Sequence, residues 1–313
     1  MTLRYVILLA SLGALSNGCA QDERFRSGEL RATVNGVELA YEIVGNGEPV
    51  LFIPSVIGDS FEPLMGEAAL DGYTLIKYHQ RGMGHSGSDP YDGVSMQTGR
   101  AQDAAALLHY LDVERAHVVG HSSAAYVAMR LAIDEPRLVH SLVLLDGNLT
   151  DLDVRGPEFE RRLESFLDDV VPPPNGRPTQ QQAQELAKAP NEWMMIWLTG
   201  VTDWEQYLSR WIPDIREQFD TFYSNRERPR EGQSGAAPFF AERSEIESVS
   251  QPSIYVLSEE RSPDGLVHHQ RLQELLPQLE TAEISGVGHG LHLQDPTAVA
   301  EVIGKFLADH PMQ

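Results

Sequence analysis

Residues 120–124 read Gly-His-Ser-Ser-Ala and join an apolar run to an alanine-rich stretch typical of a helix. Small residues at Gly120 and Ala124 allow a sharp turn between a strand and a helix, which would lift the Ser122 hydroxyl clear of the backbone. A serine hydroxyl is a weak nucleophile unless a base takes its proton and a third group orients that base. The turn therefore predicts a nucleophilic Ser122, with the backbone N–H of Ser123 facing a developing oxyanion.

The base and the acid must come from other parts of the chain. His289 lies in ISGVGHGLHLQDP, residues 284–296, directly after the last expected strand, from where an imidazole can reach the turn. His289 is therefore the expected base. His292, three residues later, and His121, inside the turn, have no such support and are expected to be surface or lid contacts.

The elements that would position these residues are short apolar strands separated by helices. Strands are expected at 49–55, 73–79, 116–121, 140–147, 252–258 and 281–287, and helices at 97–112, 123–134, 266–276 and 296–310. Ahead of them, residues 31–55 alternate in polarity around Asn35-Gly36 and Asn46-Gly47, which are hairpin signals, so two antiparallel strands open the domain. Apolar strands alternating with helices predict a mostly parallel sheet covered on both faces.

This alternation stops between residues 148 and 250, which are polar and helix-forming. The segment is expected to form a helical lid inserted into an α/β core made of residues 28–147 and 251–313. It holds all four tryptophans, of which Trp193 and Trp197 are one helical turn apart, a spacing more typical of packing than of ligand contact.

The turn, the His289 segment and YHQRGMGHSGSDP at residues 78–90 together resemble the α/β-hydrolase family over nearly the whole expected mature chain. The last of these is similar to the family segment D-x-R-G-x-G-x-S, with His79 in place of the aspartate. The resemblance implies an α/β-hydrolase fold with an inserted helical lid. Family members carry His-Gly after the third strand; here Pro54-Ser55 takes that place, which makes Val56 the second expected oxyanion donor beside Ser123.

The resemblance leaves the acid open. Family members mostly take it from the loop after strand seven, and counting back from Leu275-Leu276-Pro277 puts Arg261 there, which cannot stabilise an imidazolium. Some members place the acid at the end of strand six, where this chain has Asp146. We expect Asp146 to be the acid, in preference to Glu260, which would need a local shift of its loop.

The expected activity is hydrolysis of carboxylic esters or related small acyl compounds through an acyl-Ser122 intermediate, with no metal and no organic cofactor. Two alternatives stay open. The Gln-Arg-Gly turn at 80–82 is shared with proline-releasing aminopeptidases. The departures at 54, 55, 124 and 261 would also suit a protein that binds a small ligand with vestigial activity.

The composition of the chain indicates which classes of partner the protein can bind. The chain has 313 residues, 42% of them hydrophobic, enough for a sizeable core. Its net charge of −22, from 46 acidic and 24 basic residues, would repel phosphate backbones and disfavours nucleic acid as a partner. Oligomeric state leaves no signal in the sequence.

Residues 1–19 resemble a secretory signal, because Arg4 precedes an apolar run that ends at Leu15 and is too short to span a bilayer. Cys19 lies where a bacterial lipoprotein signal places its acylated residue, although Ser16 stands where that signal has leucine. The protein is expected to be exported to the periplasm or the medium, or anchored to a membrane through lipidated Cys19.

Overall fold

The computed structural model describes residues 29–55, 57–89, 91, 94, 96–147, 195–196, 198–201, 203–227, 241–260 and 263–312. These ranges leave out the expected signal segment with Cys19 and much of the expected lid. They also leave out Val56, Arg261, Trp193 and Trp197. Within them, no helix is both long enough and apolar enough to cross a membrane.

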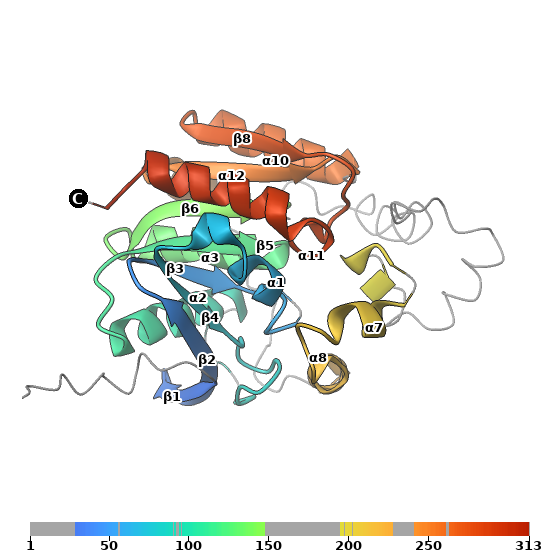
Figure 1. Cartoon of the computed structure of the whole chain (residues 1–313). Coiled ribbons are helices and arrows are strands. Elements are labelled where there is room, and N and C mark those ends of the chain that lie inside the picture. Colours follow the sequence, from blue (N-terminus) through green and yellow to red (C-terminus); the bar gives the residue numbers. More distant parts are fainter. Residues whose placement is uncertain are drawn as a thin grey trace, which may run out of the picture.

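A single mixed sheet forms the centre of the described core (Figure 1). The strands run in the spatial order β1-β2-β4-β3-β5-β6-β7-β8. The first two pairings, β1 with β2 and β2 with β4, are antiparallel, and all other pairings are parallel. The strand bounds are β1 Leu30–Val34, β2 Val37–Gly45, β3 Glu48–Ile53, β4 Tyr73–Tyr78, β5 Ala116–His121, β6 Val139–Leu145, β7 Ser253–Ser258 and β8 Leu279–Ile284. The expected mostly parallel sheet is confirmed.

Of the two Asn-Gly signals, only the first makes a hairpin. Asn35 and Gly36 have φ of 46° and 74°, as a tight turn of this hand requires, and they join the antiparallel strands β1 and β2. A hairpin at Asn46-Gly47 is wrong, because β2 and β3 both pair with β4, which lies between them. The second Asn-Gly therefore joins two strands that are not neighbours.

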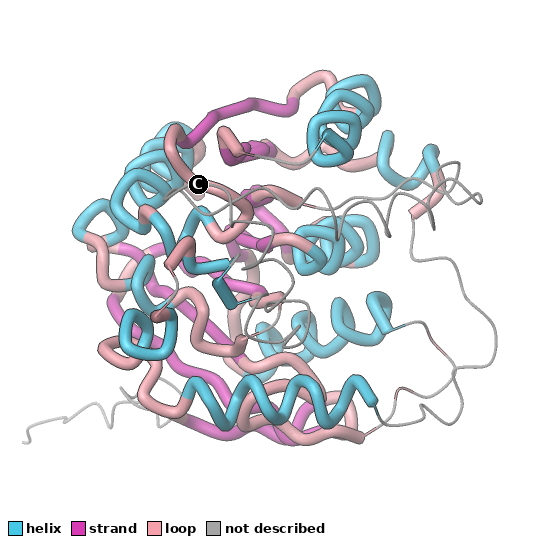
Figure 2. The backbone as a smooth tube through the Cα atoms, turned by 90° about the vertical axis from the view of Figure 1, so that its right-hand side faces the viewer, coloured by secondary structure: helices cyan, strands magenta, loops and turns pink. Residues whose placement is uncertain are grey.

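Helices cover both faces of the sheet, as the views along two directions show (Figures 1 and 2). One face packs against α2 Met96–Tyr110, α3 Ser123–Asp134 and α10 Pro263–Leu275, with α9 Arg243–Glu247 against α3 and α10. The other face packs against α1 Glu62–Met65, the short helix η2 Ala68–Leu70, α11 Leu291–Gln294 and α12 Pro296–Asp309. The four helices expected from the sequence correspond to α2, α3, α10 and α12.

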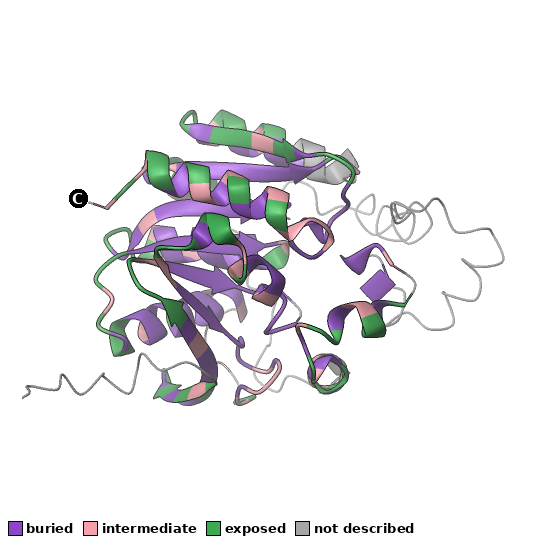
Figure 3. Cartoon of the chain, viewed as in Figure 1, coloured by how far each residue is buried: buried purple, intermediate pink, exposed green. Residues whose placement is uncertain are grey.

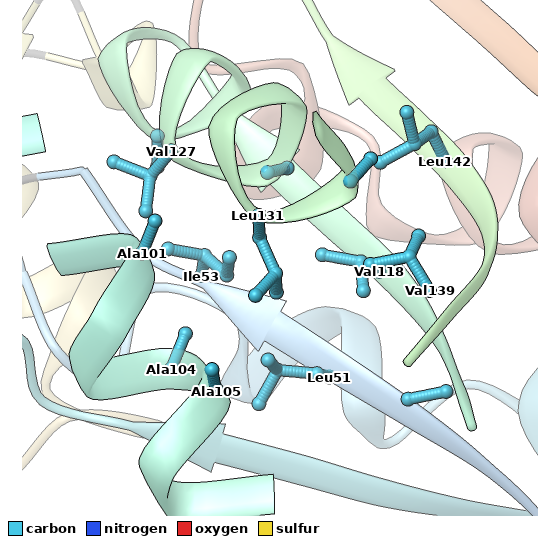
Figure 4. Packing of buried hydrophobic residues seen from close by; sticks show 14 of the residues in the cluster. Leu51, Ile53, Ala101, Ala104, Ala105, Val118, Val127, Leu131, Val139 and Leu142 are labelled. Atoms are coloured by element: carbon cyan, nitrogen blue, oxygen red, sulfur yellow. The ribbon is translucent and has the colours of Figure 1, made fainter. Parts of the chain in front are cut away.

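The inner parallel strands β3, β5, β6 and β7 are mostly apolar on both sides because both sides are buried (Figure 3). In β3, Leu51 and Ile53 point to the α2 and α3 side, where they pack near Ala101, Ala104 and Leu131 (Figure 4). Their neighbours Val50 and Phe52 join the cluster under α12. Alternate residues of one strand thus belong to two different cores, and all four are fully buried.

The part of the segment inserted between β6 and β7 that the structure describes includes α7 Trp204–Leu208 and α8 Ile215–Glu227, which Figure 1 shows beyond the same end of the sheet as α11. Its apolar residues form a cluster of their own with two residues from the core, Ile57 and Leu293. Members of this cluster from the inserted segment are Met195, Ile196, Leu198, Trp204, Leu208, Ile212, Ile215 and Phe219. This described part is thus packed on the carboxyl-terminal end of the sheet, where open α/β sheets bind ligands.

Candidate active site

Ser122 stands at the turn between β5 and α3 in a conformation that few residues adopt. Its φ and ψ are 55° and −123°, and it serves as the N-cap residue of α3. The backbone is held there by two hydrogen bonds: Ser122 N–H donates to Leu145 O (3.0 Å), and Ser122 O accepts from Ala125 N–H (3.1 Å). Strained backbone maintained by its surroundings is typical of functional sites, and the predicted strand-turn-helix is present.

Two glycines let the chain pack closely around this turn. A Cβ on Gly120 would lie 2.5 Å from Ala124 O, and a Cβ on Gly147 would lie 2.6 Å from Ala125 Cβ. Gly120 therefore allows β5 and the first turn of α3 to approach, and Gly147 allows the end of β6 to lie against α3. The methyl group of Ala124, where the family pattern has glycine, is fully buried in this core.

The structure brings Ser122, His289 and Asp146 together from three separate loops. His289 Nε2 lies 2.8 Å from Ser122 Oγ, and His289 Nδ1 lies 2.7 Å from Asp146 Oδ2. An ionised carboxylate only accepts hydrogen bonds, so Nδ1 donates to Asp146 and Nε2 is left to accept from the Ser122 hydroxyl. His289 and Asp146 are buried, and Ser122 is partly exposed. This arrangement can move a proton from the serine to the imidazole.

Asp146 lies directly after β6 and has a φ of 43°. Its backbone N–H donates to Val256 O (2.8 Å) in β7, and its Oδ1 lies 3.5 Å from the Ser258 N–H. Burial by itself would raise the pKa of this carboxyl, but the hydrogen bond and charge of His289 outweigh burial and bring the pKa below its ordinary value. The group therefore stays ionised beside the imidazole.

Glu260, the alternative acid, is not part of this arrangement. Its backbone N–H donates to Val287 O (3.1 Å), and its Oε2 is buried without a hydrogen-bond partner in the part of the chain that the structure describes. The carboxylate that faces His289 Nδ1 is that of Asp146.

On the oxyanion side, Ser123 is the first residue of α3, so its backbone N–H belongs to those that a helix leaves without an intrahelical acceptor. Val56, the other expected donor, falls outside the described residues. Gly58, two residues later, makes room for a side chain: a Cβ there would lie 2.0 Å from His79 Cδ2.

His121 and His292 do not lie at the surface, so the expectation of surface contacts is wrong. Each is 1% exposed. The His121 ring centroid lies 4.8 Å from that of His289 and 4.3 Å from that of His292, with the ring planes tilted by 45° and 52°, so the three imidazoles form a buried cluster. The i, i+3 spacing of His289 and His292 could have indicated a shared face, but the contact of both with His121 joins residues far apart in the sequence.

His79, which replaces the family aspartate, has a carboxylate partner from another loop. Its Nε2 donates to Asp59 Oδ1 (2.9 Å), and its Nδ1 accepts from the His85 backbone N–H (2.8 Å). Asp59 also accepts hydrogen bonds from Lys77 and from Gln218 Nε2, the latter at 2.5 Å. Burial opposes ionisation of Asp59, but His79 and Lys77 prevail and hold the pKa of its carboxyl well below the usual range. The carboxylate here comes from the loop after β3, whereas the family segment has it at position 79, directly after β4.

Metal-ligand side chains gather in two groups among the described residues, both centred on His85 and not on Ser122: Glu29 with His79 and His85, and His85 with Asp214 and Glu217. The two ring nitrogens of His85 already face Glu29 and Asp214 as hydrogen-bonded ion pairs. Both ring nitrogens of His79 are likewise occupied. The ring nitrogens of both histidines therefore already have partners.

Known proteins resemble the chain over most of its length. The putative non-heme bromoperoxidase BpoC of Mycobacterium tuberculosis is 29% identical over 280 residues, which cover 87% of this chain and 98% of that protein. Two solved structures share the fold: naproxen esterase from Bacillus subtilis (TM-score 0.66, 17% identity, 90% of this chain and 92% of that one) and the enol-lactonase from Burkholderia xenovorans (TM-score 0.63, 18% identity, 89% and 100%). At such identities the structures show the fold alone.

A model of the alpha/beta hydrolase fold family matches residues 48–296, which include β3 to β8, Ser122 and His289. The match spans more than half of the chain and agrees with the observed strand order. The chain therefore belongs to the alpha/beta hydrolase fold family.

Proposed function

We propose that the protein is a serine hydrolase that cleaves carboxylic esters or related small acyl compounds through an acyl intermediate on Ser122. The observation that carries the proposal is the hydrogen-bonded chain from Ser122 Oγ through His289 to Asp146. Nucleophile, base and orienting carboxylate are the three groups that acyl transfer by serine requires.

In the first half of the reaction, Ser122 Oγ attacks the acyl carbon while His289 Nε2 takes its proton. Asp146 accepts the Nδ1–H hydrogen bond, keeps the imidazole in the required tautomer and offsets the charge of the imidazolium. Negative charge develops on the former carbonyl oxygen, where the Ser123 N–H at the start of α3 would donate. His289 then protonates the leaving alcohol, and the acyl group stays on Ser122.

In the second half, water takes the place of the alcohol. His289 removes a proton from the water as it attacks the acyl carbon, and the same proton returns to Ser122 Oγ when the acyl bond breaks. The carboxylic acid leaves, and the serine hydroxyl is restored. Across both halves, the three side chains supply the nucleophile of the first step, the proton transfers and the orientation of the base.

The contacts of the site argue against the two alternatives, a proline-releasing aminopeptidase and a small-ligand-binding protein with vestigial activity. The Gln-Arg-Gly turn that suggested an aminopeptidase has an internal role here: Gln80 Nε2 donates to Pro54 O, and Arg81 donates to Asp103 from Nε (3.0 Å) and Nη2 (2.7 Å). A ligand-binding protein with vestigial activity would not need the 2.8 Å contact between His289 and Ser122.

Two assays test the proposal. The first is labelling with a fluorophosphonate probe, and the second compares hydrolysis of nitrophenyl esters of increasing acyl length with hydrolysis of proline amides. Wild-type protein should label at Ser122 and hydrolyse short esters faster than proline amides. Ser122→Ala should lose labelling and about four to six powers of ten in turnover, whereas Ser123→Ala keeps its backbone donor and should retain much of the activity. Slow labelling with no ester turnover would favour the binding protein, and preferred cleavage of proline amides the aminopeptidase.

A further inference from the structure

His121 is the buried imidazole between the elements of the proposed active site. It ends β5, directly before Ser122, and its ring lies against both His289 and His292. Its two ring nitrogens contact two other segments of the chain. Its Nε2 lies 2.7 Å from the backbone carbonyl oxygen of His289, and its Nδ1 lies 3.2 Å from Ser55 Oγ.

These two contacts define which nitrogen carries the proton. A carbonyl oxygen only accepts, so Nε2 carries hydrogen and donates to His289 O. The neutral ring then has a lone pair on Nδ1, which accepts from the Ser55 hydroxyl. Burial, and next the neighbouring His289, lower the pKa of His121 to about 3, which agrees with a ring that stays neutral at ordinary pH.

His292, in the same cluster, differs from His121 in its hydrogen bonding. Both of its ring nitrogens are buried without a hydrogen-bond partner in the described part of the chain. Its ring packs on Phe61, at 4.9 Å between centroids, and on His121. Its contacts are thus those of an apolar aromatic ring, whereas the contacts of His121 need a donor at one nitrogen and an acceptor at the other.

We propose that His121 is a positioning residue that locks the catalytic base and the oxyanion loop to the nucleophile turn. It holds the His289 loop by that residue's own carbonyl, and it holds the loop after β3 through Ser55, the residue before the expected donor at position 56. The inference rests on the proposed serine mechanism. A misplacement of about 1 Å at a reacting group can cost on the order of 10²-fold in rate, so loosening these bonds should lower kcat more than it raises KM.

Side-chain replacements can separate hydrogen bonding from packing. His121→Phe keeps a ring and removes both bonds. His121→Gln can place an amide N–H near the position of Nε2 and keep the bond to His289 O, whereas His121→Asn can reach only toward Ser55. His292→Phe is the matched control, because it changes a buried histidine of the same cluster that makes no such bonds to the residues placed in the structure.

The experiment measures kcat and KM per active site with a nitrophenyl ester, counting active sites by fluorophosphonate labelling. We expect kcat to fall about 100-fold in His121→Phe with KM changed less than about threefold, most of the loss to be recovered in His121→Gln and little in His121→Asn. His292→Phe should stay within about threefold of wild type. Equal losses in His121→Phe and His292→Phe, or no loss in His121→Phe, would overturn the inference.

A second variant covers the case in which His121→Phe does not fold. Ser55→Ala removes only the hydroxyl that donates to His121 Nδ1, and we expect kcat per labelled site to fall about threefold to tenfold. In the double variant with His121→Gln, the loss of kcat should be smaller than the product of the two single losses. Unchanged kcat in Ser55→Ala, or fully multiplicative losses, would contradict the inference. Failure of the wild type to label would instead remove the proposed function, and the inference with it.

Discussion

At the residue scale, two of the three residues in the proposed triad carry a positive φ, 55° at Ser122 and 43° at Asp146. Each such position costs on the order of 1–3 kcal/mol for a residue other than glycine, less for aspartate, which adopts it more readily. Both backbones are held by an N–H that donates to the neighbouring strand, Ser122 to Leu145 O and Asp146 to Val256 O. The sheet therefore stabilises the two turns that direct these side chains toward His289.

The acid can be tested with a substitution that spares the backbone. Asparagine tolerates a positive φ, so Asp146→Asn should leave the free energy of unfolding close to that of the wild type. Because the amide cannot hold the His289 tautomer or offset its charge, we expect kcat to fall by about 10⁴ with little change in substrate binding. Steady-state kinetics with a nitrophenyl ester and urea unfolding would measure both effects.

Glu260→Gln is the control for this prediction. Its carboxylate does not face His289, so both kcat and stability should stay close to wild type. A large loss of kcat in Glu260→Gln together with an active Asp146→Asn would transfer the role to Glu260.

At the element scale, the inserted segment is joined to the core by polar contacts as well as by apolar packing. Gln218, fully buried on α8, donates to Asp59 Oδ2, and its Oε1 accepts from the Asp59 backbone N–H at 3.3 Å. Tyr207 on α7 donates to Leu293 O (2.6 Å) in α11, four residues after His289. The inserted helices thus contact both the loop after β3 and the loop that carries the base.

The sequence predicted the strands and helices of the core because their signals are local: apolar runs, alanine-rich stretches and turn residues lie within one element. It did not predict the partner of His79, because Asp59 comes from another loop, nor the burial of His121 and His292. These contacts depend on how distant loops meet at one end of the sheet, which no local pattern encodes. The hairpin predicted at Asn46-Gly47 was wrong for the same reason, because β4 lies between the two strands that this turn joins.

Asp59 supplies the carboxylate that contacts His79 and Lys77, and its role can be tested by restoring the aspartate that the family segment has at position 79. His79→Asp would place a second carboxylate beside buried Asp59, where two like charges repel. We expect the free energy of unfolding to fall by about 3 kcal/mol, the order seen when a buried ion pair is broken. Urea unfolding at neutral pH would measure the loss.

A double-mutant cycle distinguishes charge repulsion from lost packing. Asp59→Asn alone should destabilise the protein, because it weakens the contact with buried Lys77. When it is added to His79→Asp, only one carboxylate remains, so the double variant should be more stable than the sum of the two single losses predicts. Additive losses would show that charge repulsion is not the cause.

At the scale of the whole molecule, export is a further prediction, which rests on Arg4, the apolar run to Leu15 and the cysteine that follows. We expect the protein isolated from its native host to begin near Cys19. Mass spectrometry of its N-terminus tests this: an intact Met1 on a cytoplasmic protein would refute export, and an unmodified cysteine would refute lipidation alone.

The stability of the molecule should depend on pH through three buried histidines. Burial lowers the pKa of His117 to about 4 and of His121 to about 3, and it brings the pKa of His292 well below its ordinary value. An unfolded histidine has a pKa of about 6.5, so below that pH the unfolded chain binds more protons than the folded protein. The stability contributed by these groups is complete above about pH 6.5 and is lost as pH falls toward 4. His85 acts the other way, because hydrogen bonds and charges of its carboxylate neighbours outweigh its burial and raise its pKa, but it is one group against three.

Urea unfolding between pH 7.5 and 4.5 should therefore show the free energy of unfolding falling steadily below about pH 6.5, each buried histidine adding at most about 1.4 kcal/mol per pH unit. His292→Phe removes one titrating ring from the buried cluster, and it removes no hydrogen bond to any residue that the structure describes. Its curve should keep the shape of the wild-type curve with a slope shallower by about the share of one histidine. A wild-type curve that is flat from pH 6.5 to 4.5, or an unchanged slope in His292→Phe, would mean that these imidazoles take up protons in the folded protein as readily as in the unfolded chain. The neutral state of His292 in the folded protein would then have to be abandoned.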